Sequence, residues 1–477
     1  MNTMPNDLLL PALVFAVYAL GVWSAFSAIL SSRNSQSAIA WALSCVMFPY
    51  VAVPLYALFG RNRFRHYVLA RRSNSAKARS VVEPLLDHAV SCEALPERYH
   101  VSCRVFEQLA SMPFTGGNSV ELLPDGEATF EIMCEQIKQA QECVLVQFYI
   151  VRADPLGMRM ARLLKQKVAE GVRVLFLYDA LGSYNLPRRY VEDLRRAGVE
   201  IYPFKAGRGW RNRLQINFRN HRKMVVTDGR WAVTGGANLG DEYRGRGPRG
   251  YWRDTMVAVA GRAAQEMQLS FAEDWLFITG HMPELNWDPR PSADGRSPVL
   301  VLPTGPADEQ PTCSMMFSQA IHSAEKRLWI TTAYFVPDKE TVRALQMAAL
   351  RGVDVRILLP DKANHLLVHW AGLTFLDELE RSGVQCWRYT KGVFHEKVVL
   401  VDDHLSLIGS ANTDNRSFYL NFECILLVAD AAFAARTKAM LEEDFANSCS
   451  SSHEAFAGRG ILFRLVARLS RLLAPIL

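Results

Sequence analysis

Two long uncharged apolar runs open the chain, at residues 8–30 and 38–59. Each is long enough to cross a ~30 Å hydrocarbon core as a helix. Pro49 and Pro54 interrupt the second run, but membrane helices tolerate proline. A cleaved signal peptide fits poorly, because no Lys or Arg precedes the first run and the run is too long. We therefore expect two transmembrane helices in residues 1–60. A buried hydrophobic hairpin of a soluble domain is the alternative.

A basic segment follows the second run directly. Positive residues beside a span stay in the cytoplasm, so both chain ends and the rest of the chain are expected there. The same cations can attract anionic lipid headgroups. We therefore interpret residues 61–104 as a basic juxtamembrane linker. Seven basic residues come before the first acid, Glu83: Arg61, Arg63, Arg65, Arg71, Arg72, Lys77 and Arg79.

From residue 105 onward, strand patterns alternate with helix patterns, and the same order occurs twice. Residues 144–151 and 171–179 are apolar strand patterns with a helical pattern between them, and residues 328–336 and 352–359 repeat that arrangement. Such alternation is typical of a layered α/β fold. We predict two copies of one unit, residues 105–290 and 291–450, packed about a pseudo-two-fold axis.

A short motif occurs once in each unit with identical spacing: His, one residue, Lys, four residues, Asp, then six residues to Gly-Gly-Ala-Asn or Gly-Ser-Ala-Asn. Residues two apart in a strand share a face, so each His lies beside its Lys. The apolar residues that follow predict a strand that reverses at the Asp and brings the Asn back toward the His-Lys face. The first copy is His221, Lys223, Asp228 and Asn238, and the second is His395, Lys397, Asp402 and Asn412.

Two such copies around one pocket suit a phosphodiester substrate. Lysine and amide donors can stabilise charge on a transferring phosphoryl group. One imidazole can attack phosphorus, while the other protonates the leaving alcohol and then deprotonates the incoming one. We include Asp228 and Asp402 with the candidate catalytic residues, although their turn positions favour a structural role. A degenerate, non-catalytic duplication is the alternative.

The constellation resembles the duplicated HKD motif of the phospholipase D superfamily, and within it the bacterial cardiolipin synthases. The similarity covers nearly the whole chain. Residues 220–223, 235–243, 251–255, 414–417 and 420–423 match that family's signatures, whereas Gln147 stands where the family pattern has Glu. The resemblance implies a fold of two phospholipase D-like α/β/α sandwich halves. It also implies a protein of the bacterial inner membrane whose catalytic region faces the cytoplasm.

The resemblance also implies a reaction and residue roles. Two phosphatidylglycerols would give cardiolipin and glycerol through a phosphohistidine, with His221 the likelier nucleophile and His395 the likelier acid and base. Asn238 and Asn412 would bind phosphate, while Glu423 and Asp254 would orient the histidines or bind the acceptor. Residue chemistry alone does not choose between the histidines. Hydrolysis, or phosphatidyl transfer involving phosphatidylethanolamine or another alcohol, is the alternative.

Composition and the remaining segments indicate which cofactors and binding partners to expect. The formal charge is +6, and nine Cys are scattered without zinc-like spacing, so we expect no metal and no cofactor. A basic aromatic loop between Gly198 and His221 suits a phospholipid headgroup or a nucleic-acid backbone. We expect lipid rather than nucleic acid, since a nuclease needs no membrane spans. Residues 451–477 predict an amphipathic tail, either lying on the membrane or docked on the soluble part.

Overall fold

The computed structural model describes residues 6–31, 35–60, 89–90, 100–205, 217–247, 249–362, 365–451 and 458–476. The basic residues between 61 and 79 lie outside this set, as does most of the basic loop before His221. The predicted linker, residues 61–104, is therefore described only at residues 89–90 and from His100 onward.

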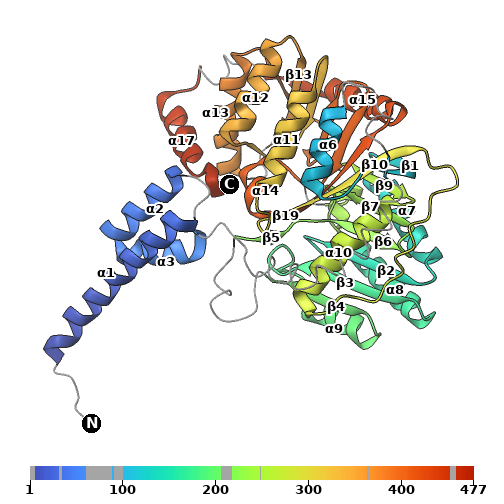
Figure 1. Ribbon diagram of the computed structural model, residues 1–477, viewed down its shortest axis with the longest axis horizontal. Helices are drawn as coiled ribbons and strands as arrows, with labels where there is room; N and C mark the ends of the chain where they lie inside the picture. The colour runs from blue at the N-terminus through green and yellow to red at the C-terminus, as the bar shows by residue number, and fades with distance from the viewer. Residues whose placement is uncertain are drawn as a thin grey trace.

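Three apolar helices at the N-terminus project from one side of the molecule: α1 (Asn6–Ser31), α2 (Ser35–Met47) and α3 (Pro49–Phe59) (Figure 1). Within the described chain, one helix is long and apolar enough to span a membrane, Leu10–Ser31. The second predicted span is not one helix, because the chain leaves the helical conformation at Phe48. A proline disfavours helical geometry in the residue before it, and Pro49 begins a new helix instead.

The three helices pack on one another through small side chains. A Cβ placed on Gly21 of α1 would lie 2.4 Å from the carbonyl oxygen of Cys45 in α2, so only glycine allows this approach. Ala25, Ala28 and Ala52 are buried beside them. Close packing through small residues is the usual way for helices to associate in a bilayer.

Residues 115–450 contain one continuous 16-stranded sheet built from two similar halves. Fifteen strands form a single order, and the sixteenth, β5 (Arg219–Asn220), pairs with β19 off that path. The halves join where β1 of the first pairs antiparallel with β10 of the second, which places the pseudo-two-fold axis between them. The first half runs β1 (Thr115–Leu123), β9 (Met256–Ala260), β7 (Trp231–Gly235), β6 (Met224–Thr227), β2 (Cys143–Phe148), β3 (Arg173–Asp179) and β4 (Glu200–Phe204). The second runs β10 (Ser297–Thr304), β19 (Asn421–Ala429), β17 (Leu405–Gly409), β16 (Val398–Val401), β11 (Arg327–Thr331), β13 (Asp354–Pro360), β14 (Gln385–Tyr389) and β20 (Ser448–Ser450).

Helices cover both faces of the sheet, which confirms the predicted α/β/α layering (Figure 1). On one face, α10 (Ala263–Thr279) and α15 (Ala431–Ala446) pack over a hydrophobic core that both halves share. The opposite face carries a separate core in each half. These cores are covered by α7 (Gly126–Gln139), α8 (Pro155–Ala169) and α9 (Arg188–Arg196) in the first half, and by α11 (Thr312–Ser323), α12 (Lys339–Leu350) and α13 (Leu366–Glu380) in the second.

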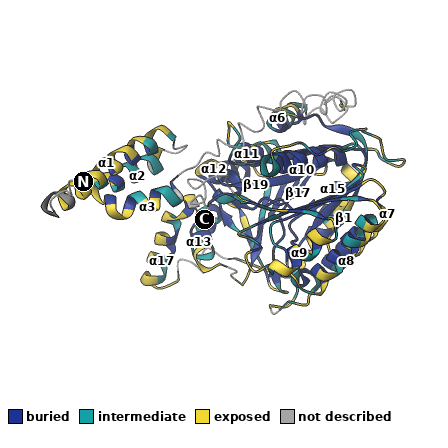
Figure 2. Cartoon of the chain, turned by 90° about the horizontal axis from the view of Figure 1, so that it is seen from below, coloured by how far each residue is buried: buried dark blue, intermediate teal, exposed yellow. Residues whose placement is uncertain are grey.

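Two flanking helices pack against the second half. Helix α6 (His100–Ala110) precedes β1 in sequence but packs on α11 of the second half, where Ser102 accepts a 3.0 Å hydrogen bond from Gln319. Helix α17 (Ile461–Leu472) lies on α13, where Arg471 pairs with Glu378 at 2.8 Å. It also leaves apolar side chains exposed, on the same side of the molecule as α1–α3 (Figure 2).

Candidate active site

Short strands that cross between the halves hold the two His-Lys segments. β5 (Arg219–Asn220) pairs with β19, and the amide of His221 then donates to the carbonyl of Phe422 at 2.9 Å. β15 (Val393–Phe394) pairs with β8 (Trp252–Arg253) of the first half, and the amide of His395 donates to the carbonyl of Arg253 at 2.8 Å. Each histidine is therefore fixed against the opposite half at the shared interface.

Each histidine also receives a carboxylate from the opposite half. Nδ1 of His221 lies 2.9 Å from Oε2 of Glu423, and Nδ1 of His395 lies 2.7 Å from Oδ2 of Asp254. The carboxylates hold the proton on Nδ1, which leaves the lone pair on Nε2. Three more donors bind Glu423: Ser410 at 2.5 Å, Ser417 at 2.9 Å and Asn421 at 3.0 Å.

The two lysines lie beside their histidines, as the strand periodicity predicted. Nζ of Lys223 donates to the carbonyl oxygen of His221 at 2.5 Å, and Lys397 donates to the carbonyl oxygen of His395. Both lysines are buried. Nζ of Lys223 also lies 5.5 Å from the ring centre of Tyr149, whose ring contacts His221 edge to face.

Burial lowers the pKa of both histidines and of both lysines in the site. It lowers the pKa of His221 to about 4, although Glu423 opposes this, and it lowers the pKa of His395 to about 3. It also lowers the pKa of Lys223 to about 7 and lowers that of Lys397. Lys397 contributes to the lowered pKa of His221, and Lys223 to that of His395, so the two copies interact electrostatically. An anionic substrate would reverse these shifts, because negative charge favours protonated neighbours.

The two candidate phosphate-binding asparagines differ in their contacts. The side-chain oxygen of Asn238 accepts from the amide of Ile150 at 3.1 Å, and its nitrogen donates to the Tyr243 hydroxyl at 2.8 Å. The side-chain oxygen of Asn412 is buried without a hydrogen-bond partner among the described residues. Both the oxygen and the nitrogen of the Asn238 side chain therefore already have a hydrogen-bond partner within the protein.

The two aspartates of the motifs lie in turns at the far ends of their strands. Asp228 accepts hydrogen bonds from the backbone amides of Gln141, Glu142 and Cys143, each at 2.8 Å. Asp402 likewise accepts hydrogen bonds from the backbone amides of Lys326 at 2.8 Å and Arg327 at 2.9 Å. Four strand residues lie between each lysine and its aspartate, so their Cα atoms are five residue steps, roughly 16 Å, apart. The geometry gives both carboxylates a structural position and places neither beside the histidines.

Comparisons with known proteins agree with this arrangement. The family profile described as "Cardiolipin synthase, PLD-like domain" matches residues 133–275 and 317–445, and one described as "Phospholipase_D-nuclease N-terminal" matches residues 19–61. Cardiolipin synthase A of Pseudomonas aeruginosa PAO1 is 44% identical over 480 residues, covering 100% of this chain and 98% of that protein. The chain belongs to the cardiolipin synthase family of phospholipase D-like proteins. Cardiolipin synthase A of Pseudomonas fluorescens SBW25 is 45% identical over 475 residues, covering 98% of each chain.

A solved structure shows the same fold outside the cardiolipin synthase family. Phosphatidylserine synthase of Haemophilus influenzae superposes with a TM-score of 0.62 at 15% identity, covering 79% of this chain and 100% of that one. The two-half architecture is therefore found beyond close relatives. Within the described residues, no cluster of three or more His, Cys, Asp or Glu side chains is arranged to hold a metal.

Gln147, where the resemblance led us to expect Glu, belongs to a buried polar network around Asp274. Its Nε2 donates to Asp274 at 2.7 Å, and Asn220 donates to the same oxygen at 2.8 Å. Arg222 forms an ion pair with Asp274 at 2.9 Å. A glutamate at position 147 would bring a second buried carboxylate against Asp274, so the neutral amide suits this site.

A second buried ion cluster links the halves beneath His395, and sequence reasoning missed it. Arg253 of the first half binds Asp444 at 2.7 Å and Glu396 at 3.1 Å, both in the second half. Burial raises the pKa of Glu396 to about 7. Glu396 and Arg222 hold the same position in the two motifs, so a charged residue between His and Lys was the available signal.

Proposed function

We propose that this protein joins two phosphatidylglycerol molecules into cardiolipin and glycerol through a phosphohistidine. The observation that carries the proposal is the pair of buried histidines, each oriented by a carboxylate from the opposite half. The arrangement leaves Nε2 of both rings available for chemistry on one phosphodiester, with Lys223 and Lys397 supplying positive charge beside it.

The reaction follows from two proton transfers and two substitutions at phosphorus. Nε2 of His221 attacks the donor phosphorus, and the glycerol oxygen leaves with a proton from His395. The hydroxyl of a second phosphatidylglycerol then gives its proton to His395 and attacks the same phosphorus, which releases His221. The anionic substrate favours protonation of His395 before the first step, against the effect of burial.

The lipid substrate and the membrane location are supported by two exposed apolar surfaces. Helix α1 contains the span Leu10–Ser31. Helix α17 docks on α13 through Ala467 and Ser470 and exposes Ile461, Leu462 and Leu472 by 80%, 72% and 73%. A helix docked on a soluble body normally hides its apolar stripe, so the outward leucines suit a bilayer. We place these helices in the bacterial inner membrane, with the catalytic region in the cytoplasm and no nucleic acid partner.

Purified protein with phosphatidylglycerol vesicles tests the reaction. Cardiolipin and glycerol in equal amounts are expected, whereas phosphatidic acid would indicate hydrolysis instead. Ethanolamine and phosphatidylethanolamine added separately would reveal other acceptors or donors. His221→Ala and His395→Ala should each abolish turnover. With lipid labelled in its phosphate, His221→Ala should also lose the acid-labile phosphoenzyme, and retention of label by that variant would overturn the assignment of the nucleophile.

The location has a separate test. A cysteine-reactive reagent that does not cross membranes should label a cysteine introduced after Leu477 only when inverted inner-membrane vesicles are used. Labelling of intact spheroplasts would place the catalytic region on the other side.

A further inference from the structure

Helices α2 and α3 fold back on each other at Phe48 instead of continuing in one direction. The ring centres of Trp41 in α2 and Tyr56 in α3 lie 5.5 Å apart. These residues are 15 positions apart in sequence, which corresponds to roughly 22 Å along a continuous helix. The two helices are therefore the arms of a hairpin, with its bend at Phe48.

The bend lies beside the middle of α1. A Cβ added to Gly21 would lie 2.4 Å from the carbonyl oxygen of Cys45 and 3.0 Å from Cβ of Pro49. The ring centres of Tyr18 and Tyr50 are 6.0 Å apart. Gly21 and Tyr18 are near the middle of the membrane-spanning stretch of α1, so the bend reaches only about half of its length.

The second arm returns to the end of α1. The hydroxyl of Tyr56 donates to Oγ of Ser27 at 3.1 Å and lies 3.4 Å from Oγ of Ser31, the last residue of α1. Figure 1 shows the same arrangement, because α1 extends beyond the bend toward the N-terminus. The hairpin therefore begins and ends at the same end of α1.

Neither arm is long enough to cross a bilayer. Helix α2 has 13 residues and α3 has 11, which correspond to roughly 20 Å and 16 Å of helix. The hydrocarbon core is ~30 Å thick, and only α1, with 26 residues, exceeds that length among the three helices. Apolar segments of about 10–14 residues commonly enter a membrane and return, or lie buried in a core.

The bend is compatible with hydrocarbon, where unpaired backbone groups are costly. The amide of Phe48 donates to the carbonyl of Ser44 at 2.8 Å, and the carbonyl of Phe48 accepts from the amides of Val51 at 3.1 Å and Ala52 at 2.9 Å. Pro49 has no amide hydrogen to satisfy. The chain can therefore reverse inside a bilayer without exposing these groups.

The outer surface of the hairpin is apolar, and neither arm contains a charged residue. Contiguous exposed apolar surfaces mark sites of interaction with proteins or membranes. The exposed apolar side chains are Ile39, Leu43, Val46 and Met47 of α2, Phe48 at the bend, and Tyr50, Val51 and Leu55 of α3.

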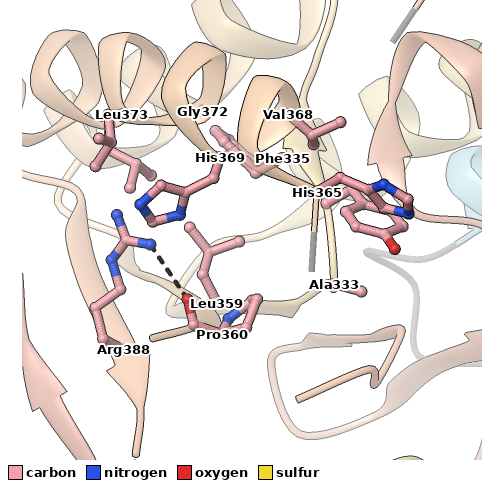
Figure 3. A pocket seen from close by; sticks show the side chains of 12 residues that line it. Ala333, Phe335, Leu359, Pro360, His365, Val368, His369, Gly372, Leu373 and Arg388 are labelled. Carbon is pink, nitrogen blue, oxygen red and sulfur yellow. Dashed lines mark hydrogen bonds between the residues drawn. The ribbon is translucent and has the colours of Figure 1, made fainter. Parts of the chain in front are cut away.

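A pocket of the catalytic part shows the contrast with this surface. The pocket lies under the first turns of α13 and is also lined mainly by apolar side chains, but His365, His369 and Arg388 lie among them (Figure 3). Arg388 donates to the carbonyl of Pro360 at 3.3 Å. Such groups suit water or a polar ligand, whereas the arms of the hairpin offer neither His nor a charged side chain. Hydrocarbon is the surrounding that fits the hairpin.

We propose that, within residues 6–60, only α1 crosses the membrane, and that α2 and α3 form a re-entrant hairpin that contacts the acyl chains of one leaflet. That leaflet faces the catalytic part, because residues 61–99 contain no apolar run long enough to cross again. The start of α1 then lies on the opposite side of the membrane, unlike the arrangement expected from the sequence. The inference goes beyond the proposed reaction and does not depend on the substrate.

The basic residues of the sequence support this arrangement. Arg33 occurs between α1 and α2, and Arg61, Arg63 and Arg65 follow α3 directly. A re-entrant hairpin keeps all of them on one side of the membrane, as is usual for positive residues beside membrane segments. Two complete spans would separate Arg33 from the others.

Labelling of introduced cysteines with a reagent that does not cross membranes tests the arrangement. Asn6→Cys marks the start of α1, and Ser35→Cys marks the start of α2. Ser35→Cys should be labelled from the same side as a cysteine added after Leu477, and Asn6→Cys from the opposite side. Two complete spans predict the reverse for both. Spheroplasts and inverted inner-membrane vesicles expose the two sides, and the unaltered protein, with its nine cysteines, gives the background for each.

Phe48→Cys tests the depth of the bend. Its side chain is exposed on the protein surface, so it should gain a label after detergent dissolves the bilayer and from neither side before that. Labelling of Phe48→Cys in intact membranes would mean that the hairpin lies in water, and the proposal would fail.

Three other results would also overturn it. Labelling of Ser35→Cys from the side opposite to the added C-terminal cysteine would indicate two complete spans. Labelling of Asn6→Cys from the same side as that cysteine would mean that α1 does not cross. Protection of Asn6→Cys or Ser35→Cys from both sides would place that end of the helix inside the bilayer. Failure of the proposed function is distinguishable, since a protein that makes no cardiolipin can still give the expected labelling pattern.

Discussion

Nδ1 of His221 lies 2.9 Å from the carboxylate of Glu423, although 202 residues separate them in sequence. His395 and Asp254 repeat the relationship at 2.7 Å with the halves exchanged. Each half therefore contributes one histidine to the site and one carboxylate that orients the histidine of the other half. Neither half holds a complete site, so the joint between β1 and β10 is part of the chemistry as well as of the fold.

Glu423→Gln should lower kcat by about 10²- to 10⁴-fold, with a smaller change in KM. The amide cannot offer the negative charge that fixes Nδ1–H and stabilises the imidazolium, and comparable substitutions in other His–carboxylate pairs cost about 10⁴-fold. Steady-state kinetics on phosphatidylglycerol would measure the change. Glu443→Gln, at an exposed position on α15, is the control and should behave like the wild type. An unchanged kcat in Glu423→Gln would mean that the carboxylate does not assist His221.

Asp228→Asn should destabilise the protein by about 1–3 kcal/mol without lowering kcat of the folded fraction. The carboxylate accepts three backbone hydrogen bonds, and an amide oxygen replaces them poorly. Asparagine tolerates the positive φ of 54° at this position, so the backbone itself need not change. Denaturant unfolding and kinetics on the same samples would separate the two effects.

Asp403→Asn provides the matched control, because Asp403 is exposed and pairs only at the surface with Arg327. Its effect should stay below about 1 kcal/mol. If Asp228→Asn had normal stability but a much lower kcat, Asp228 would have a catalytic rather than a structural role.

Local patterns predicted much of this molecule, because their evidence lies within a few residues. Nearly continuous apolar runs placed β2 and β3, and matched motif spacing placed His221 beside Lys223 and His395 beside Lys397. The break at Phe48 was missed because the second run was interpreted as a membrane helix, where proline is tolerated. The pairing of Arg253 with Glu396 and Asp444 could not be read from one sequence, since it depends on how the halves dock.

Glu266 should make the protein less stable as the pH rises from about 4.5 to about 8. Its carboxyl group is fully buried at the joint between the halves, where it accepts from Thr115 at 2.9 Å and from the amide of Val301 at 2.8 Å. Burial raises its pKa to about 8, well above the usual value near 4.5. The neutral form is favoured in the folded state, so the stabilisation is complete below about pH 4.5 and is lost as the pH rises through 8.

Glu266→Gln keeps the shape and removes the titration. The difference in unfolding free energy between the variant and the wild type should shift in favour of the variant between pH 5 and 8, by up to ~1.4 kcal/mol per pH unit. Denaturant unfolding across that range would measure it. Glu121→Gln, at an exposed position on β1, should show no such slope. A pH-independent difference for Glu266→Gln would mean that the carboxyl group is already charged in the folded protein.

The exposed leucines of α17 should matter for activity on bilayers but not for activity on dispersed lipid. Leu465 and Leu469 are 53% and 52% exposed and face away from α13. Replacing both by serine removes apolar area worth roughly 1.5–3 kcal/mol per side chain if the bilayer covers it. The double variant should turn over vesicle phosphatidylglycerol several-fold more slowly, yet match the wild type on short-chain phosphatidylglycerol in detergent. Leu350→Ser, which removes an even more exposed leucine (70%) at the end of α12, should leave both rates unchanged. Helix α1 is unchanged in every variant, so the double variant differs from the wild type only at the surface of α17. If the double variant and the wild type have equal rates on vesicles, α17 does not contact the membrane.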